Sequence, residues 1–209
     1  MYQLFYSPGT CSMAVHVLLN ELGQKFELLK ADLSETPRSP ALMKFNPRGQ
    51  VPVLVVDGKP LREGAAILSY LCETHKSPLL PASGWERAKA QEWLAFANST
   101  LHPAYGRLFF LMRQLGEKWA ENPVFIAALG MVQKHWDDIE QELQTQPYIC
   151  GKDMTVADIL LTVIANWSAR FAGKITLGVK TKDYLKRVSS RPAYQEALKT
   201  ESVEYKVAA

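Results

Sequence analysis

Long hydrophobic runs are absent from this sequence. No stretch approaches the roughly 20 apolar residues that span a bilayer. The first residues read directly as a short strand and lack the charged and apolar segments of a signal peptide. We therefore expect a cytoplasmic protein that has no membrane partner.

Cysteine is scarce, and histidine follows no metal-binding pattern. The three cysteines stand at positions 11, 72 and 150, and their odd number and wide spacing argue against a disulfide framework. The four histidines form no HxxxH or HExxH arrangement, and no pair of cysteines has the spacing of metal ligands. We expect a reducing compartment and no metal site.

Charge of one sign is also limited. The formal net charge of +3 is too small to indicate a nucleic-acid partner, and no basic run is interleaved with aromatic residues. What the sequence does contain is ordinary for a globular protein, with 47% hydrophobic and 22% charged residues over 209 positions. This length suits one large domain or two small ones.

The residues that carry chemistry begin with the stretch 2–13. Residues 4–6 read as a buried strand and 7–9 as a turn, and the apolar positions that follow have helical spacing until Gly23. Cys11 therefore falls at a helix start, where unpaired N–H groups and the helix dipole lower the pKa of a thiol. Cys11 is then a reactive thiol, or a thiol that hydrogen-bonds another sulfur, or else a small buried apolar residue; this stretch alone does not decide.

The first 80 residues alternate between strands and helices. A second strand at 26–29 completes a parallel βαβ unit. After a short helix near 41–45, a strand at 51–56 turns at Asp57-Gly58 into an antiparallel edge strand at 59–61, and a helix opens at 63–66. This order, βαβ and then ββα, predicts a mixed four-stranded sheet.

Residues 76–86 read as a linker because they hold two prolines, two serines and a glycine. Beyond it we expect only helices: one over 86–112 with a kink at Pro103, one over 123–143, one that starts at Thr155 with a capping box, and two short ones over 181–190 and 192–200. The third is apolar on nearly all sides and should be central. The predicted domains are 1–80 and 86–209.

Four motifs, taken together and in order, resemble those of a known family. They are Tyr6-Ser7-Pro8-Gly9-Thr10-Cys11-Ser12, Asn46-Pro47-Arg48-Gly49-Gln50-Val51-Pro52, Arg62-Glu63-Gly64-Ala65-Ala66-Ile67, and Tyr148-Ile149-Cys150-Gly151 leading into Thr155-Val156-Ala157-Asp158. The chain resembles the cytosolic glutathione S-transferases. Within this family its first motif is similar to that of the bacterial beta class, whose signature residue at this place is a cysteine. The resemblance implies a thioredoxin-like α/β domain followed by an all-α domain, and a homodimer that uses glutathione as co-substrate with no cofactor.

The resemblance also implies a position for each part of glutathione. Val51, before a cis Pro52, would pair its backbone with the cysteinyl part as a short added strand. Glu63 and Gly64, at a helix start, would hold the γ-glutamyl group. Cys11 would lie near the glutathione sulfur, where it would either donate a hydrogen bond to the thiolate or form a mixed disulfide.

Hydroxyl and imidazole groups are further candidates near the sulfur. Other classes of the family use hydroxyls for this task, and Tyr6 and Ser12 are the hydroxyls here; we expect Tyr6 to be mainly structural but keep it among the glutathione-binding candidates. The segment from Ser99 to His102 should line the cleft, with His102 as a second catalytic residue. His16 is expected to pack between the domains or to support the structure.

The electrophile is expected to bind apolar surface between the domains. The candidate residues are Tyr105, Phe109 and Trp167, with Phe171 as a further one, and each of them is as compatible with a place in the core. Trp167 follows the apolar run of the predicted central helix by one turn, which favours the cleft.

Two positions depart from the family pattern. The basic residue that should reach the glycyl carboxylate aligns with Thr36 here, so Arg38 or Lys30 would have to replace it. The asparagine on the dimer-facing helix is replaced by Ala95, which would remove one contact across the expected dimer.

Three functions are compatible with the sequence. The first is a transferase that activates glutathione with Cys11 and conjugates it to hydrophobic electrophiles. The second is a glutathione-dependent thiol–disulfide oxidoreductase that works through a Cys11 mixed disulfide, although Cys11 has no CxxC partner. The third is a non-catalytic binder of apolar ligands in the cleft between the domains.

Overall fold

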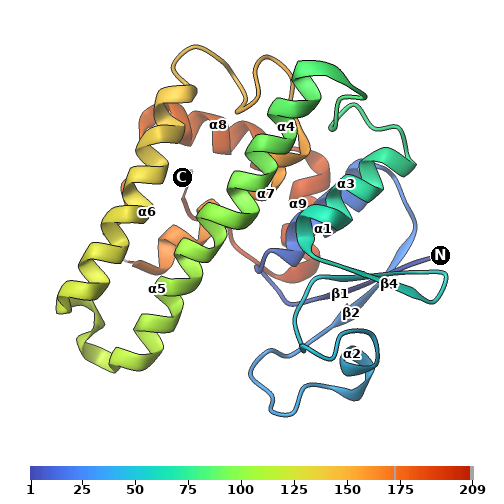
Figure 1. The fold of residues 1–209 in the computed structure, drawn as a ribbon, viewed down its shortest axis with the longest axis horizontal. Helices are drawn as coiled ribbons and strands as arrows, with labels where there is room; N and C mark the ends of the chain where they lie inside the picture. Colours follow the sequence, from blue (N-terminus) through green and yellow to red (C-terminus); the bar gives the residue numbers. More distant parts are fainter. Residues whose placement is uncertain (172, 208–209) are drawn as a thin grey trace.

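The computed structural model describes residues 1–171 and 173–207, which form an α/β half and a helical half (Figure 1). The α/β half contains a four-stranded sheet in the order β2-β1-β3-β4. Strand β1 pairs in parallel with β2 and antiparallel with β3, and β3 pairs antiparallel with β4. The strands are β1 Tyr2–Tyr6, β2 Phe26–Lys30, β3 Val53–Val56 and β4 Lys59–Arg62. The predicted mixed sheet and thioredoxin-like order are confirmed.

Successive side chains of a strand point in opposite directions, so the central strands contribute to a hydrophobic cluster on each face of the sheet. Leu4 belongs to the main core, which two helices cover, and its neighbour Phe5 belongs to a smaller cluster with Leu42 of helix α2. The covering helices are α1 Ser12–Glu21 and α3 Gly64–Thr74 on the main core, and α2 Pro40–Phe45 on the smaller cluster.

Strand β3 begins at Val53, two residues later than the spacing predicts. The Val51–Pro52 peptide is cis, as the resemblance implies, and Pro52 has no N–H group to donate to a sheet ladder. At its other end β3 turns into β4 through Asp57 and Gly58, whose φ angles of 47° and 82° are the left-handed values that a two-residue hairpin turn requires. Val51 and Pro52 therefore lie outside the sheet, just before it.

The helical half is built around one buried helix. All 10 residues of α7 (Val156–Ala165) are buried, and α7 packs against α1 and α3 of the other half as well as α4 and α8. Apolar residues of both halves form one continuous core. The other elements are α4 Gly84–Phe96, η1 Ala97–Leu101, α5 His102–Leu115, η2 Gly116–Glu121, α6 Pro123–Glu142, η3 Asn166–Phe171, α8 Val179–Ser189 and α9 Pro192–Glu201. Among the residues that the structure describes, no helix combines the length and apolar character needed to cross a membrane.

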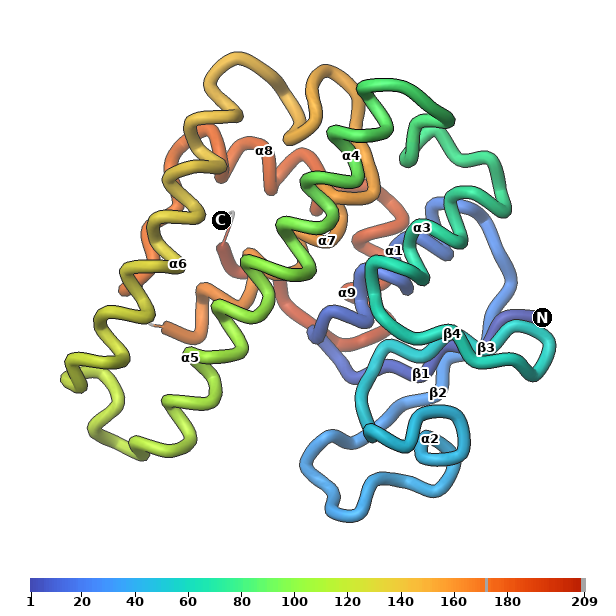
Figure 2. Tube along the Cα trace, in the orientation of Figure 1, coloured from blue at the N-terminus to red at the C-terminus, as the bar shows by residue number. Residues whose placement is uncertain are grey.

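Helix α4 continues into α5 as one long helical run (Figure 2), and the pitch of this run changes just before Pro103. Residues 97–101 form the π-helical turn η1, and α5 begins at His102. The sequence predicts one helix with a kink at the proline, whereas the structure has two α-helices joined by this wider turn. Pro103 has no N–H group and its ring crowds the carbonyl four residues earlier, which a wider turn relieves. The extra width changes which residues of the turn face the neighbouring cleft.

Side-chain hydrogen bonds fix the start of α7. The buried Asp158 carboxylate accepts hydrogen bonds from the N–H of Thr155 (2.7 Å), the hydroxyl of Thr155 (2.9 Å) and the N–H of Ile149 (2.9 Å). The predicted capping box is therefore present. The same carboxylate also holds the turn at residues 148–151 against the helix.

Candidate active site

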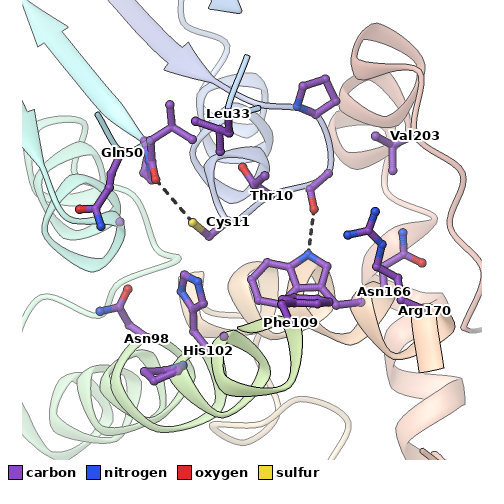
Figure 3. A pocket seen from close by; sticks show the side chains of 18 of the residues that line it. Thr10, Cys11, Leu33, Gln50, Asn98, His102, Phe109, Asn166, Arg170 and Val203 are labelled. Atoms are coloured by element: carbon purple, nitrogen blue, oxygen red, sulfur yellow. Dashed lines mark hydrogen bonds between the residues drawn. The ribbon is translucent and has the colours of Figure 1, made fainter. Parts of the chain in front are cut away.

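A cleft of about 1270 Å³ lies between the two halves (Figure 3). The loop between β1 and α1, the segment before β3 and the start of α3 line one side of it. Helix α5, the short helix η3 and the C-terminal segment 203–206 line the other. Most of the predicted site residues are among its lining residues: Cys11, Val51, Pro52, Glu63, Gly64, His102, Phe109 and Trp167.

Cys11 stands at the N-terminus of α1, with its Sγ at the cleft. The thiol donates a hydrogen bond to the carbonyl oxygen of Val51 at 3.8 Å (Figure 3). Burial raises the pKa of the Cys11 thiol to about 12, because the loss of water outweighs the hydrogen bonds from the N–H groups of Cys11 and Ser12. The lowered pKa expected for a helix start is therefore wrong. At neutral pH Cys11 is a protonated thiol that can donate a hydrogen bond.

The hydroxyl groups of Tyr6 and Ser12 lie outside the cleft. Ser12 is fully buried, and its hydroxyl oxygen accepts a hydrogen bond from the N–H of Ser7 at 3.1 Å. Tyr6 packs edge-on against His16, with ring centroids 6.4 Å apart, and does not line the cleft. The structure therefore places Tyr6 among the residues that support the loop and not at the predicted glutathione site.

Glu63 and Gly64 mark the start of α3 at the rim of the cleft. Glu63 has a left-handed backbone, with φ of 69°, and its carboxylate pairs with Arg48 at 3.1 Å. Gly64 is the first helical residue, so its N–H group has no partner within the helix. N–H groups at a helix start bind a carboxylate, and Glu63 can accept from an ammonium group. The rim can therefore hold both the carboxylate and the ammonium group of an amino acid.

A cationic side chain reaches the cleft from the connector between β2 and α2. Arg38 lines the cleft, whereas Thr36 and Lys30 do not. The stem of Arg38 packs closely on Gly49, since a Cβ atom there would lie 2.7 Å from Arg38 Cγ. Gly49 also has a φ of +65°, which favours glycine. Of the two replacements considered for the family's basic residue, the geometry favours Arg38.

Three rings form the opposite wall of the cleft. The His102 ring meets the Trp167 ring edge-on with centroids 5.0 Å apart, and the Phe109 centroid lies 5.9 Å from that of Trp167. Trp167 donates its Nε1–H to the carbonyl of Gly9 at 2.8 Å, which ties η3 to the loop before Cys11. Burial lowers the pKa of His102, so its imidazole is uncharged at neutral pH. Figure 3 shows His102 and Cys11 on facing sides of the cleft.

Three residues expected in the cleft do not reach it. Ser99 is exposed, and Asn98 lines the cleft in its place, because the π-helical turn is wider than the α-helical turn that the spacing predicts. Tyr105 is fully buried, and its hydroxyl accepts a hydrogen bond from Trp136 Nε1 at 2.7 Å. Phe171 is fully buried as well. Tyr105 and Phe171 are thus core residues.

An acidic residue that the sequence analysis missed holds the loop before Cys11. The buried carboxylate of Glu201, at the end of α9, accepts hydrogen bonds from His16 Nδ1 and from the N–H of Gly9, each at 2.9 Å. Trp167 bonds the carbonyl of the same glycine, so both peptide groups flanking Gly9 are tied to the helical half. His16 lies between the two halves, as expected. No local pattern marks Glu201, because its partners lie 185 and 192 positions earlier in the chain.

Replacing Glu201 with glutamine should lower the free energy of unfolding by about 1–2 kcal/mol, because the amide replaces one acceptor oxygen of a buried carboxylate. Urea denaturation followed by circular dichroism measures this loss. The matched control is Glu196→Gln on the same helix, where the side chain is exposed and the expected change is small. Equal stability of the two variants would contradict the role given to Glu201.

Comparison with known proteins agrees with this architecture. Residues 2–73 match the family model "Glutathione S-transferase, N-terminal domain", and residues 108–192 match "Glutathione S-transferase, C-terminal domain". Glutathione S-transferase GstA of Escherichia coli O157:H7 is 32% identical over 209 residues, which cover 97% of this chain and 100% of that protein.

Two solved structures are similar over almost the whole chain. A sphingomonad glutathione S-transferase complexed with glutathione has a TM-score of 0.82 and 32% identity, covering 97% of this chain and 100% of that one. The beta-class glutathione S-transferase of Sphingomonas chungbukensis has a TM-score of 0.82 and 31% identity, again covering 97% and 100%. The likeness to these proteins thus extends over the α/β half, the helical half and the cleft between them. The chain is a member of the glutathione S-transferase family.

Proposed function

We propose that this protein is a beta-class glutathione transferase that joins the glutathione sulfur to hydrophobic electrophiles. The observation that carries the proposal is Cys11, a protonated thiol 3.8 Å from the carbonyl oxygen of Val51, in a cleft whose other wall is aromatic. The two sphingomonad proteins support it, since one was solved with glutathione and the other is a beta-class enzyme. Glutathione is here a co-substrate, and the proposal includes no further cofactor.

Glutathione would lie along the α/β side of the cleft. Its γ-glutamyl carboxylate would accept from the N–H of Gly64, and its ammonium would donate to Glu63. The cysteinyl part would pair with the backbone of Val51 in the manner of an added strand. The glycyl carboxylate would meet Arg38. In this pose the sulfur of glutathione lies next to Cys11.

Cys11 would act as a hydrogen-bond donor. Its S–H group would turn from the carbonyl of Val51 to the glutathione thiolate, which lowers the pKa of the glutathione thiol and raises its nucleophilic fraction. The uncharged imidazole of His102 would accept the proton released from that thiol and pass it to solvent. The thiolate then forms a carbon–sulfur bond with the electrophile, and the leaving group departs with the electron pair of the broken bond.

The two other functions fit the geometry less well. A mixed disulfide forms by attack of a thiolate, and the burial that raises the pKa of Cys11 keeps its thiolate scarce at neutral pH. This observation favours conjugation over disulfide exchange. A purely apolar binder would not need a cation in the connector, and Arg38 places one in the cleft.

The proposal also includes a homodimer in the cytoplasm. Support comes from exposed apolar side chains on the helical half, among them Phe110 on α5, which is 54% exposed, and Met131 on α6. A second copy of the chain would remove such surface from water. Ala95 is exposed on α4, and its methyl group would make no hydrogen bond across such a dimer.

A conjugation assay tests the proposed reaction directly. The protein is mixed with glutathione and 1-chloro-2,4-dinitrobenzene, and formation of the thioether is followed by absorbance. We expect saturable turnover above the uncatalysed rate that requires both reagents. Absence of turnover, with this and with neutral α,β-unsaturated carbonyl compounds, would overturn the proposal.

Replacing Arg38 with alanine should raise the KM for glutathione about five- to tenfold, because a charge-assisted hydrogen bond to the glycyl carboxylate is lost at a partly exposed site. The value of kcat should change little, since Arg38 lies away from the sulfur. Steady-state kinetics with varied glutathione measure both constants. The control is Lys30→Ala, which removes the same charge outside the cleft. An equal rise of KM in the two variants would show that general charge, and not Arg38, matters.

A further inference from the structure

We infer that the electrophile half of the cleft is built for aromatic substrates that carry a carboxylate on the side opposite their reactive carbon. This inference rests on the proposed function, because it names the substrate class of the same site. It depends on three features of the cleft: the aromatic wall that Phe109 and Trp167 form, arginine side chains without acidic partners, and a C-terminal segment fixed by hydrogen bonds.

The aromatic wall lies between the Cys11 thiol and Arg170. The rings of Phe109 and Trp167 lie next to each other in the cleft. Figure 3 shows Cys11 on one side of Phe109 and Arg170 on the other. The guanidinium carbon of Arg170 lies over the Phe109 ring, 5.7 Å from its centroid, a cation–π distance that holds the charge beside this ring. A flat ring that packs against the aromatic wall between Cys11 and Arg170 would therefore direct one end to the sulfur and the other to Arg170.

Two arginines that line the cleft have no acidic partner among the described residues. Arg113 of α5 and Arg170 of η3 both line the cleft, and within residues 1–171 and 173–207 neither forms an ion pair. Lys206 also lines it, and its ammonium is paired with Glu204 at 3.3 Å. The guanidinium group of Arg170, next to Phe109, is thus left for an anion from the substrate, and a planar guanidinium suits a carboxylate.

The C-terminal segment that closes this end is held in place. Asn166 donates from Nδ2 to the carbonyl of Glu204 at 2.8 Å and accepts from the N–H of Lys206 at 2.8 Å. The hydroxyl of Tyr205 donates to the carbonyl of Thr162 in α7 at 3.1 Å. These bonds fix the wall beside Arg170 before any substrate arrives, so the substrate does not bear the cost of ordering it.

A halogenated nitrobenzoate has the required chemistry. In 4-chloro-3,5-dinitrobenzoate the carbon that bears chlorine lies opposite the carboxylate. The glutathione thiolate forms a bond to this carbon, the carbon–chlorine bond breaks, and chloride leaves with its electron pair. The thiol proton passes to solvent, and no oxidant or reductant takes part. The corresponding amide, 4-chloro-3,5-dinitrobenzamide, is a matched neutral substrate.

The test compares these two electrophiles with the wild-type protein and with Arg170→Gln. Each kcat/KM is divided by the uncatalysed rate constant of the same compound with glutathione, which removes differences in intrinsic reactivity. We expect the wild type to favour the carboxylate, and Arg170→Gln to lower this preference roughly fivefold. The preference should also fall as salt is added. Lys182→Gln, which removes one charge from α8 outside the cleft, should keep the preference.

A binding measurement separates failure of this inference from failure of the proposed function. Calorimetric titration with 3,5-dinitrobenzoate and 3,5-dinitrobenzamide, in the presence of glutathione, requires no turnover. Tighter binding of the carboxylate that is lost in Arg170→Gln supports the inference even if conjugation is not seen. Turnover of the amide with equal or poorer use and binding of the carboxylate would overturn the inference and leave the transferase activity standing.

Discussion

Replacing Cys11 with alanine is expected to lower kcat/KM for glutathione conjugation about 10- to 100-fold, the cost of removing a hydrogen bond to a charged sulfur in a partly buried site. The thiol of Cys11 donates to the carbonyl of Val51 at 3.8 Å in the structure, so it lies beside the segment along which glutathione is proposed to bind. Alanine leaves the thiolate without this donor. Steady-state kinetics with saturating electrophile and varied glutathione measure the loss.

Two further variants make this result specific. Cys11→Ser keeps a donor group and should recover a substantial part of the activity, whereas a nucleophilic role would be lost in both variants. Cys72→Ala removes a buried thiol of α3 that does not line the cleft and should retain the wild-type rate. Wild-type kinetics in Cys11→Ala would contradict the proposed role. A glutathione adduct of the wild-type protein that turns over faster than conjugation would move the assignment to disulfide exchange.

Asp158→Ala should be the most destabilising of the substitutions considered, with a loss of about 3 kcal/mol in the free energy of unfolding. Its carboxylate accepts three hydrogen bonds, from the N–H and hydroxyl of Thr155 and from the N–H of Ile149. Alanine would leave these buried donors without a partner. Because α7 packs against α1 and α3, the whole molecule should unfold at lower urea concentration. Urea denaturation monitored by tryptophan fluorescence measures the shift.

The control substitutions for this prediction lie in the same segment. Thr155→Ser keeps the hydroxyl that donates to Asp158, so it should cost far less than the loss of the carboxylate. Asp153→Ala removes an exposed carboxylate from the preceding turn and should leave stability nearly unchanged. If Asp158→Ala unfolded at the same urea concentration as Asp153→Ala, the capping box would not be what fixes α7.

The parts of the fold that depend on local patterns could be predicted from the sequence. The order of strands and helices in the first 80 residues, the Asp57-Gly58 hairpin and the capping box at Thr155 depend on residues a few positions apart, and all three are present in the structure. The approximate position of Cys11 at a helix start was predictable for the same reason. Each of these features is decided by neighbours along the chain.

The parts that depend on distant contacts could not be predicted. Whether Tyr105 faces a cleft or the core depends on Trp136, which offers its hydroxyl a buried partner. Asn98 replaces Ser99 at the cleft because a π-helical turn has a different pitch from the α-helix that spacing assumes. The pKa of Cys11 depends on how much water the folded chain excludes, and that burial outweighs the local effect of the helix start.

The most direct test of the account is the pKa of the thiol of bound glutathione, measured by ultraviolet absorbance of the thiolate during a pH titration of the complex. If Cys11 donates a hydrogen bond to this sulfur, the pKa lies below that of free glutathione in the wild-type complex and moves back toward the free value in Cys11→Ala. Equal pKa values in the two complexes would contradict the central claim, because the Cys11 thiol would then have no influence on the sulfur that it is proposed to stabilise.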